Sequence, residues 1–135
     1  MLCGEMARVR APLTGLVASA LTVSACGQDP VRVAGGTLAV TVDEYRLRPQ
    51  DVSVAPGRLT LVVRDTGRLT HNLRVAVSGG EPGEAPRLLG GTPTAHPGET
   101  VRGSVRLEPG EYRLVCTIAN HDDLGMRGVL TVEGR

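Results

Sequence analysis

Hydrophobic and polar residues alternate along most of the chain after residue 36. Leu38, Val40 and Val42 alternate with smaller or hydroxyl side chains over residues 37–42. This period of two residues is that of a strand with one buried face. The same period or short apolar runs recur at residues 52–54, 59–63, 69–77, 101–107, 110–116 and 128–132. The pattern therefore predicts a chain of short β-strands.

Turn residues separate these segments. Pro-Gly pairs stand at 56–57, 97–98 and 109–110, and Asp65-Thr66-Gly67 divides two further segments. Residues 78–98 contain six glycines and four prolines, which predicts a long loop with a short helical turn near residues 87–89. No segment leaves room for helices of about ten residues or more between the strands. We therefore expect an all-β antiparallel sandwich of about seven to eight strands.

The N-terminal segment has a different pattern. Arg8 and Arg10 precede an apolar run over residues 13–23, which is shorter than the roughly 18 apolar residues that a transmembrane helix needs. A basic start followed by a short apolar run is typical of an export signal. Met1 and Met6 both precede the basic pair, so both are candidate starts.

The signal segment ends in Val23-Ser24-Ala25-Cys26, which resembles the lipobox of bacterial lipoproteins. This resemblance implies a signal peptide over 1–25, lipidation of Cys26, a tether over 26–36 and a folded domain over 37–135. The lipid would anchor an exported, extracytoplasmic protein to the cell membrane. The alternative is an ordinary cleaved signal in which the cysteine occurs by chance.

Charge and composition narrow the possible functions. Without residues 1–25 the chain keeps 13 arginines and 13 acidic residues, and this balance argues against nucleic acid as a partner. The chain has no phenylalanine, tryptophan or lysine, so its core must consist of aliphatic side chains. The length fits one domain of about 110 residues, which is large enough to fold alone.

Two metal-binding side chains point toward the predicted core. His71 has the parity of Leu73 and Val75, and Cys116 has the parity of Leu114. Because strand ends meet at the poles of a sandwich, these two side chains can lie close together. In an exported domain Cys116 would have no disulfide partner once Cys3 and Cys26 are removed or modified. Such an unpaired cysteine is usually either a buried, inert residue or a metal ligand or nucleophile, and its neighbours decide between these.

The spacing Cys116-x4-His121-x4-Met126 adds two more candidate ligands. One thiolate, two imidazoles and a weak thioether suit copper that alternates between Cu(I) and Cu(II). Each of these residues alone is more often an ordinary core residue. Their occurrence together in an exported β domain favours a metal site.

Three segments resemble the cupredoxin family. Pro109–Cys116 is similar to the strand that leads into the family's copper loop, and Gly125–Val132 is similar to its Gly-Met-basic-Gly ending and last strand. Thr70-His71-Asn72-Leu73 resembles the upstream ligand with the asparagine that follows it. The resemblance extends over about residues 37–132.

The resemblance implies an eight-stranded Greek-key sandwich with one copper ion at a pole. His71, Cys116 and His121 would be the equatorial ligands and Met126 the axial one. Asn72 would brace the ligand loop by hydrogen bonding to the backbone of the loop or to Thr117. Such contacts orient the residues that hold a metal. The chain departs from the family pattern at two positions: Leu114 stands where an aromatic residue is common, and Asn120 where glycine is common.

The function implied is that of a blue copper electron carrier, monomeric and without enzyme activity. Its partner would be another redox protein, such as a membrane oxidase or reductase. The alternative is a copper-delivery protein for an exported or membrane oxidase, although Met126 is the only methionine after residue 25. Catalysis at copper would need further histidine-rich sites, and His96, the one remaining histidine, is expected to be exposed in a loop.

Overall fold

The computed structural model describes residues 27–134, which contain ten β-strands and no helix. The signal segment 1–25 and the lipidation site Cys26 lie outside the described residues. The strands are β1 (Val31–Arg32), β2 (Thr37–Asp43), β3 (Arg46–Arg48), β4 (Val52–Val54), β5 (Gly57–Asp65), β6 (Arg74–Val77), β7 (Leu88–Gly91), β8 (Thr100–Leu107), β9 (Gly110–Val115) and β10 (Arg127–Val132). Within residues 27–134 no helix is long and apolar enough to cross a membrane.

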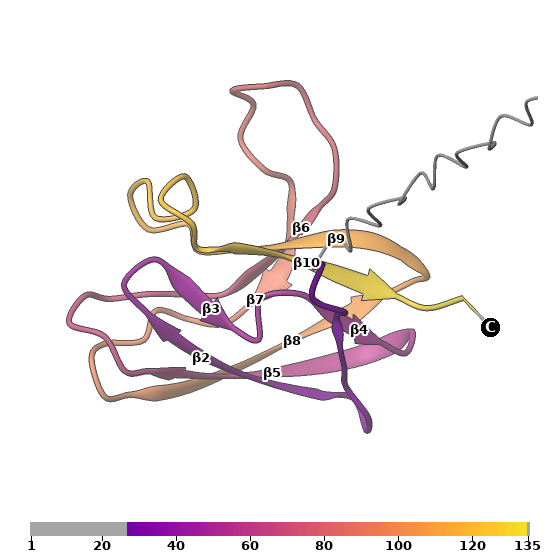
Figure 1. Cartoon of the computed structure of the whole chain (residues 1–135), viewed down its shortest axis with the longest axis horizontal. Helices are drawn as coiled ribbons and strands as arrows, with labels where there is room; N and C mark the ends of the chain where they lie inside the picture. The colour runs from indigo at the N-terminus through magenta and orange to yellow at the C-terminus, as the bar shows by residue number, and fades with distance from the viewer. Residues whose placement is uncertain (1–26, 135) are drawn as a thin grey trace, which may run out of the picture.

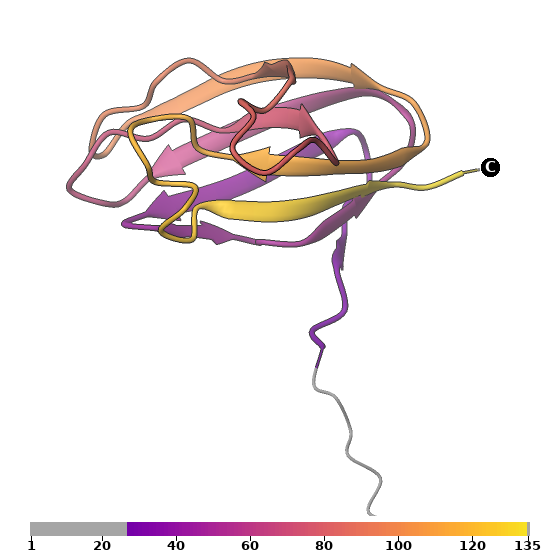
Figure 2. The ribbon, with the colours of Figure 1, turned by 90° about the horizontal axis from the view of Figure 1, so that it is seen from above.

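The strands form one strongly curled sheet. Their order is β1-β4-β10-β9-β6-β7-β8-β5-β2-β3. The sheet curls until β3, the last strand in this order, contacts β10. One layer then lies around β9 and β10 and a second around β5 and β2 (Figures 1 and 2). The all-β sandwich predicted from the sequence is confirmed.

The strand count and part of the pairing differ from the prediction. Ten strands are present instead of seven to eight, because β1 and β3 are too short to show a period and β7 lies in a glycine-rich segment. Six strand pairs are antiparallel, but β1–β4, β4–β10 and β2–β5 are parallel. Alternation within one strand carries no information about the direction of its neighbour. β1 lies within the segment that we expected to be a tether.

The predicted helical turn near residues 87–89 was wrong. Residues 88–91 form β7, which pairs with β6 and β8. A Cβ atom on Gly91 would stand 2.3 Å from the carbonyl oxygen of Leu73, so glycine here permits close approach of two strands. Pairing with neighbouring strands therefore overrides a local pattern that is typical of a loop.

The core follows the alternation seen in the sequence. In β2 the side chains of Leu38, Val40 and Val42 are buried, whereas Thr37 and Ala39 are exposed. Each fully buried valine or leucine contributes about 1.5–3 kcal/mol. The aliphatic core consists of Leu38, Val40, Val42, Leu47, Val52, Val54, Leu59, Leu61, Val63, Leu73, Val75, Val105, Leu107, Leu114, Leu130 and Val132, and Cys116 and Met126 belong to the same cluster.

Three connections meet at the end of the molecule that lies away from the C-terminus (Figures 1 and 2). They are the β2–β3 turn, the segment 66–73 between β5 and β6, and the loop 116–126 between β9 and β10. All the candidate ligands are carried by the second and third of these connections. The fold therefore places them at one pole of the sandwich.

Candidate metal centre

His71 is fixed by backbone pairing. We expected one strand over 69–77, but the strand begins only at Arg74, and His71 instead forms an isolated bridge with Ala95. Its N–H donates to the Ala95 carbonyl at 3.0 Å, and its own carbonyl accepts the Ala95 N–H at 2.8 Å. The Leu73 carbonyl accepts the Thr92 N–H at 2.9 Å, and the Leu73 N–H donates to the Thr92 Oγ1 at 3.1 Å. The predicted inward direction is confirmed, since the side chain of His71 is 0% exposed.

The loop from Cys116 to Met126 is closed by its own backbone. The Cys116 N–H donates to the Met126 carbonyl at 3.0 Å, and the Met126 N–H donates to the His121 carbonyl at 3.0 Å. The His121 N–H in turn donates to the Ile118 carbonyl at 3.1 Å. These bonds hold three of the four candidate ligands in one rigid unit.

The folded chain brings His71, Cys116 and His121 together. Their candidate ligand atoms all lie within 4.8 Å of one another, and all three residues are buried. The Cys116 Sγ lies 3.7 Å from the His121 Nδ1, and the two imidazole centroids are 5.1 Å apart. Met126 is fully buried in the same cluster. These are the spacings at which a single ion contacts all three side chains.

The donors fit a copper ion. Neither nitrogen of the His71 ring has a hydrogen-bond partner among the residues that the structure describes, although the ring is fully buried. Buried polar atoms nearly always have a partner, so a metal ion on one nitrogen accounts for this exception. A thiolate with two imidazoles and a nearby thioether is the donor set of copper electron-transfer sites.

The environment keeps His121 in its ligand form. Burial lowers the pKa of His121 below its usual 6.5, and the neighbouring His71 lowers it further. Glu44 and Asp122 act in the opposite direction to a smaller extent. A metal ion binds neutral imidazole, so the site is prepared for a metal at neutral pH.

Asn72 connects the two ligand-bearing segments. Its Oδ1 accepts the Thr117 N–H at 2.9 Å, and its Nδ2 donates to the Thr117 Oγ1 at 2.9 Å. Thr117 directly follows Cys116. The residue after one candidate ligand is thus hydrogen bonded to the residue after another.

Sequence reasoning missed two residues of the β2–β3 turn. The Oε1 of Glu44 lies 3.6 Å from the Nε2 of His71, and the ring of Tyr45 meets that of His121 edge-on with centroids 5.4 Å apart. Tyr45 has a φ of 63°, which is uncommon for a residue other than glycine. Neither residue stands at ligand spacing in the sequence, so only the folded turn reveals them.

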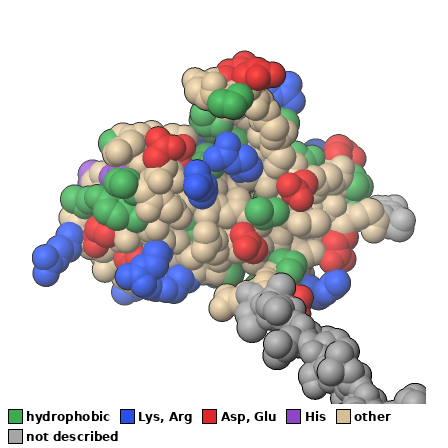
Figure 3. Space-filling model, turned by 45° about the horizontal axis from the view of Figure 1, so that its top comes forward, with side chains coloured by type: hydrophobic (Ala, Val, Ile, Leu, Met, Phe, Trp, Pro, Cys, Tyr) green, Lys and Arg blue, Asp and Glu red, His purple; other side chains and the backbone are tan. Residues whose placement is uncertain are grey.

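The two histidines differ in access to solvent. His121 is 7% exposed, whereas His71 is completely covered. Leu69 and Leu124 are exposed apolar side chains on the segments that carry the two histidines. Histidine and hydrophobic side chains share one end of the surface in Figure 3. His96 is exposed, as predicted.

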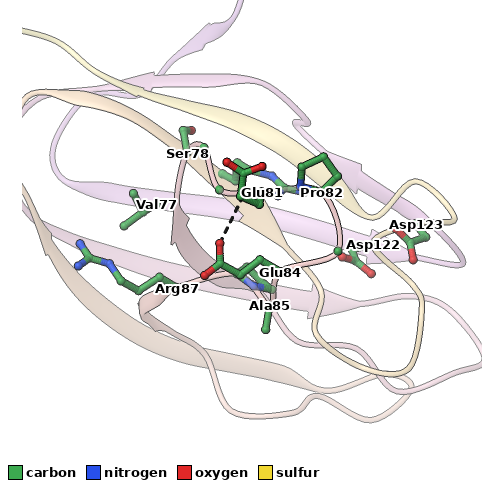
Figure 4. A pocket seen from close by; sticks show the side chains of 14 residues that line it. Val77, Ser78, Glu81, Pro82, Glu84, Ala85, Arg87, Asp122 and Asp123 are labelled. Atoms are coloured by element: carbon green, nitrogen blue, oxygen red, sulfur yellow. Dashed lines mark hydrogen bonds between the residues drawn. The ribbon is translucent and has the colours of Figure 1, made fainter.

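A hollow of about 780 Å³ borders the ligand loop but contains none of the candidate ligands. It lies between the projecting segment 78–87 and Asp122 and Asp123, which follow His121 (Figure 4). Glu81 and Glu84 face it from the projecting segment. Carboxylates and the guanidinium groups of Arg87 and Arg113 therefore line this hollow beside the metal centre.

Comparisons of sequence alone identify no relative: no family model and no curated protein matches the chain. Comparison of structures finds proteins of similar fold. Auracyanin from Roseiflexus castenholzii has a TM-score of 0.64 at 22% identity, over 76% of this chain and 100% of its own. Auracyanin A, described as a "blue" copper protein from Chloroflexus aurantiacus, has a TM-score of 0.62 at 21% identity. This match covers 76% of the present chain and 99% of auracyanin A.

An azurin from Methylomonas sp. strain J is similar to the same extent. Its TM-score is 0.62 at 21% identity, and the match covers 75% of this chain and all of the azurin. Whole chains of blue copper proteins thus superpose on the domain described here, although few residues are identical. The chain therefore has the cupredoxin fold.

Proposed function

We propose that this protein is a type 1 copper protein that carries single electrons between redox partners outside the cytoplasm. The observation that carries the proposal is the buried cluster of His71, Cys116 and His121, with ligand atoms within 4.8 Å of one another. The cluster lies at the pole of a fold shared with auracyanin and azurin. When bound, one copper ion would supply a one-electron couple between Cu(I) and Cu(II).

Each residue has a distinct part in this proposal. His71, Cys116 and His121 would hold the ion, and the thioether of Met126 would supply a weak further contact. Asn72 and Thr117 restrain the loop from outside through their mutual hydrogen bonds. Because the loop is closed by its own backbone hydrogen bonds, a change of oxidation state should require little movement of the protein. Low reorganisation of this kind favours fast electron transfer.

The partner would approach over His121. It is the more accessible of the two histidines, and the exposed Leu124 follows it by three residues. An apolar contact around a slightly exposed ligand suits a short-lived complex with another redox protein, such as a membrane oxidase or reductase. The proposal assigns no chemical reaction on a bound substrate and takes the protein to be a monomer.

The N-terminal segment would place this carrier at the membrane. The lipobox-like residues Val23–Cys26 support cleavage before Cys26 and attachment of lipid to it. Mass spectrometry of the exported protein would show an N-terminal peptide that begins at Cys26 and carries acyl chains. A peptide that begins elsewhere without lipid would instead indicate an ordinary signal peptide.

The copper proposal is tested by adding Cu(II) to the purified full-length protein. We expect an intense visible thiolate-to-copper band and narrow copper hyperfine splitting in the electron paramagnetic resonance spectrum, both bleached reversibly by a mild reductant. A colourless protein that retains only Cu(I) would point instead to copper delivery. Absence of copper binding would overturn both functions.

The axial assignment has its own test. Met126→Leu keeps the volume of this fully buried side chain, so the cost in stability should stay below about 1.5 kcal/mol. The variant should still bind copper, and its reduction potential should rise because a weak donor is lost. An unchanged potential would show that Met126 does not contact the metal.

A further inference from the structure

Glu44 is held in place beside the metal centre by backbone donors. Its Oε1 accepts the Arg68 N–H at 2.5 Å and the Leu69 N–H at 2.9 Å. Arg68 and Leu69 belong to the segment that leads to His71. The β2–β3 turn is thus joined to this segment through a single carboxylate oxygen.

The same oxygen faces the imidazole of His71. It lies 3.6 Å from the Nε2, on a ring whose two nitrogens have no hydrogen-bond partner within residues 27–134. Two backbone N–H groups donate to this oxygen, and such hydrogen bonds stabilise the ionised form of a carboxyl group. A carboxylate anion therefore stands next to a fully buried ring.

The backbone is shaped to admit this carboxylate. A Cβ atom on Gly67 would stand 2.3 Å from the Glu44 Oε1 and 3.2 Å from the Asp43 Cα. Thr66, which precedes Gly67 in the turn after β5, is joined to the end of β2: its N–H donates to the Val42 carbonyl at 2.9 Å. Any side chain at position 67 would displace the Glu44 carboxylate from this position. The approach of Glu44 to His71 is therefore part of the local packing.

We propose that Glu44 is a positioning residue for His71 in the copper site, an inference that rests on the function proposed above. Its carboxylate takes the Nε2 side of the ring and leaves the Nδ1 for the metal. A carboxylate partner on the outer nitrogen fixes the tautomer and orientation of a metal-binding histidine and makes it a stronger donor. A stronger donor and a nearby negative charge both favour Cu(II) over Cu(I). Glu44 thereby lowers the reduction potential of the site.

The test compares Glu44→Gln with the wild-type protein, both full-length and loaded with copper. Glutamine keeps an oxygen that accepts the two backbone N–H groups but removes the charge. We expect the equilibrium between the oxidation states to shift about tenfold toward Cu(I), which equals a rise of about 59 mV at one electron. Glu99→Gln is the matched control, because Glu99 also accepts a backbone N–H, from His96 at 2.9 Å, yet contacts no candidate ligand. That control should shift the equilibrium less than twofold.

A second measurement follows His71 itself. In the diamagnetic Cu(I) protein, ¹⁵N-edited proton spectra should show a slowly exchanging proton on the Nε2 of His71, and this signal should move or vanish in Glu44→Gln. Glu44→Asp, which keeps the charge but retracts it, should produce a smaller potential shift in the same direction. This variant also preserves the test if Glu44→Gln fails to fold.

The possible failures are distinguishable. A wild-type protein without the blue band would overturn the proposed function and this inference together. A blue wild-type protein whose potential is the same in Glu44→Gln and Glu99→Gln would overturn this inference alone. A His71 ring with its proton on the Nδ1 in the Cu(I) protein would also overturn it.

Discussion

The two histidines of the metal centre are held by different kinds of structure. His71 lies on a segment fixed by pairing with residues 92–95, which follow the adjacent strand β7 in the same sheet, and it is completely buried. His121 lies on a loop closed by its own backbone hydrogen bonds, and it is slightly exposed. The first region fixes the site to the sheet, and the second exposes it to solvent and to an approaching partner. One site thus combines a fixed ligand with an accessible one.

Removing the thiolate between the two histidines should have the largest effect. In Cys116→Ala we expect complete loss of the intense visible band, because no sulfur remains to transfer charge to copper. Cys116 is fully buried, but only one atom is removed, so the loss of stability should be about 1 kcal/mol. Visible absorption measures the loss of the band, and unfolding followed by circular dichroism measures the loss of stability. A coloured variant would contradict the ligand assignment.

The comparison of the histidines is tested directly by removing each ring. His71→Gly should destabilise the protein by about 3 kcal/mol, as expected for a cavity in the core, and His121→Gly should cost less. Added imidazole should restore the visible band in His121→Gly, whose cavity is open to solvent, but not in His71→Gly. Urea unfolding and absorption measure these effects. Equal rescue of both variants would show that the two sites are equally accessible.

The link between the two regions should have a smaller effect. Asn72→Ala removes two hydrogen bonds to Thr117 and should lower the free energy of unfolding by about 1–2 kcal/mol. Copper should still bind. Asn120→Ala, in the loop that contains Thr117, is the control. Asn120 is exposed, so its substitution should lower the free energy of unfolding by less than about 0.5 kcal/mol. If both substitutions lowered the free energy of unfolding by similar amounts, Asn72 would not brace the ligand loop.

Titration of His121 in the metal-free protein should have the smallest effect. Burial lowers its pKa in the folded state, so the unfolded state binds a proton first as the pH falls. The stability contributed by neutral His121 is present above about pH 6.5 and is lost as the pH falls from there through the lowered pKa. The stability difference between wild type and His121→Asn should shrink over that range. An NMR titration with a pKa at or above 6.5 would contradict this.

The sequence was sufficient for the strands with a clear period and for the residues with a clear chemistry. Alternation predicted the buried face of β2 and the inward direction of His71 and Cys116, because parity depends only on local backbone geometry. The spacing from Cys116 to Met126 also pointed to one loop. The structure brings three of the four candidate ligands within reach of one ion.

Other features depended on contacts between distant parts of the chain. β7 resembles a loop in sequence because its glycines serve close strand packing, and the parallel pairing of β2 with β5 has no local signal. Glu44 reaches His71 only because the turns at 43–46 and 65–69 dock together. Such juxtapositions have no period and no fixed spacing, so a single sequence does not disclose them.

The register at the base of the ligand loop has a consequence for the versatility of this scaffold. Val115 and Arg127 are paired across β9 and β10, so the intervening residues leave and re-enter the sheet at the same rung. The loop is therefore an exchangeable module: its length and composition can vary without shifting any strand. His71 lies outside this module and would remain in place. One unaltered framework can in this way support metal sites of different redox character through replacement of about a dozen neighbouring residues.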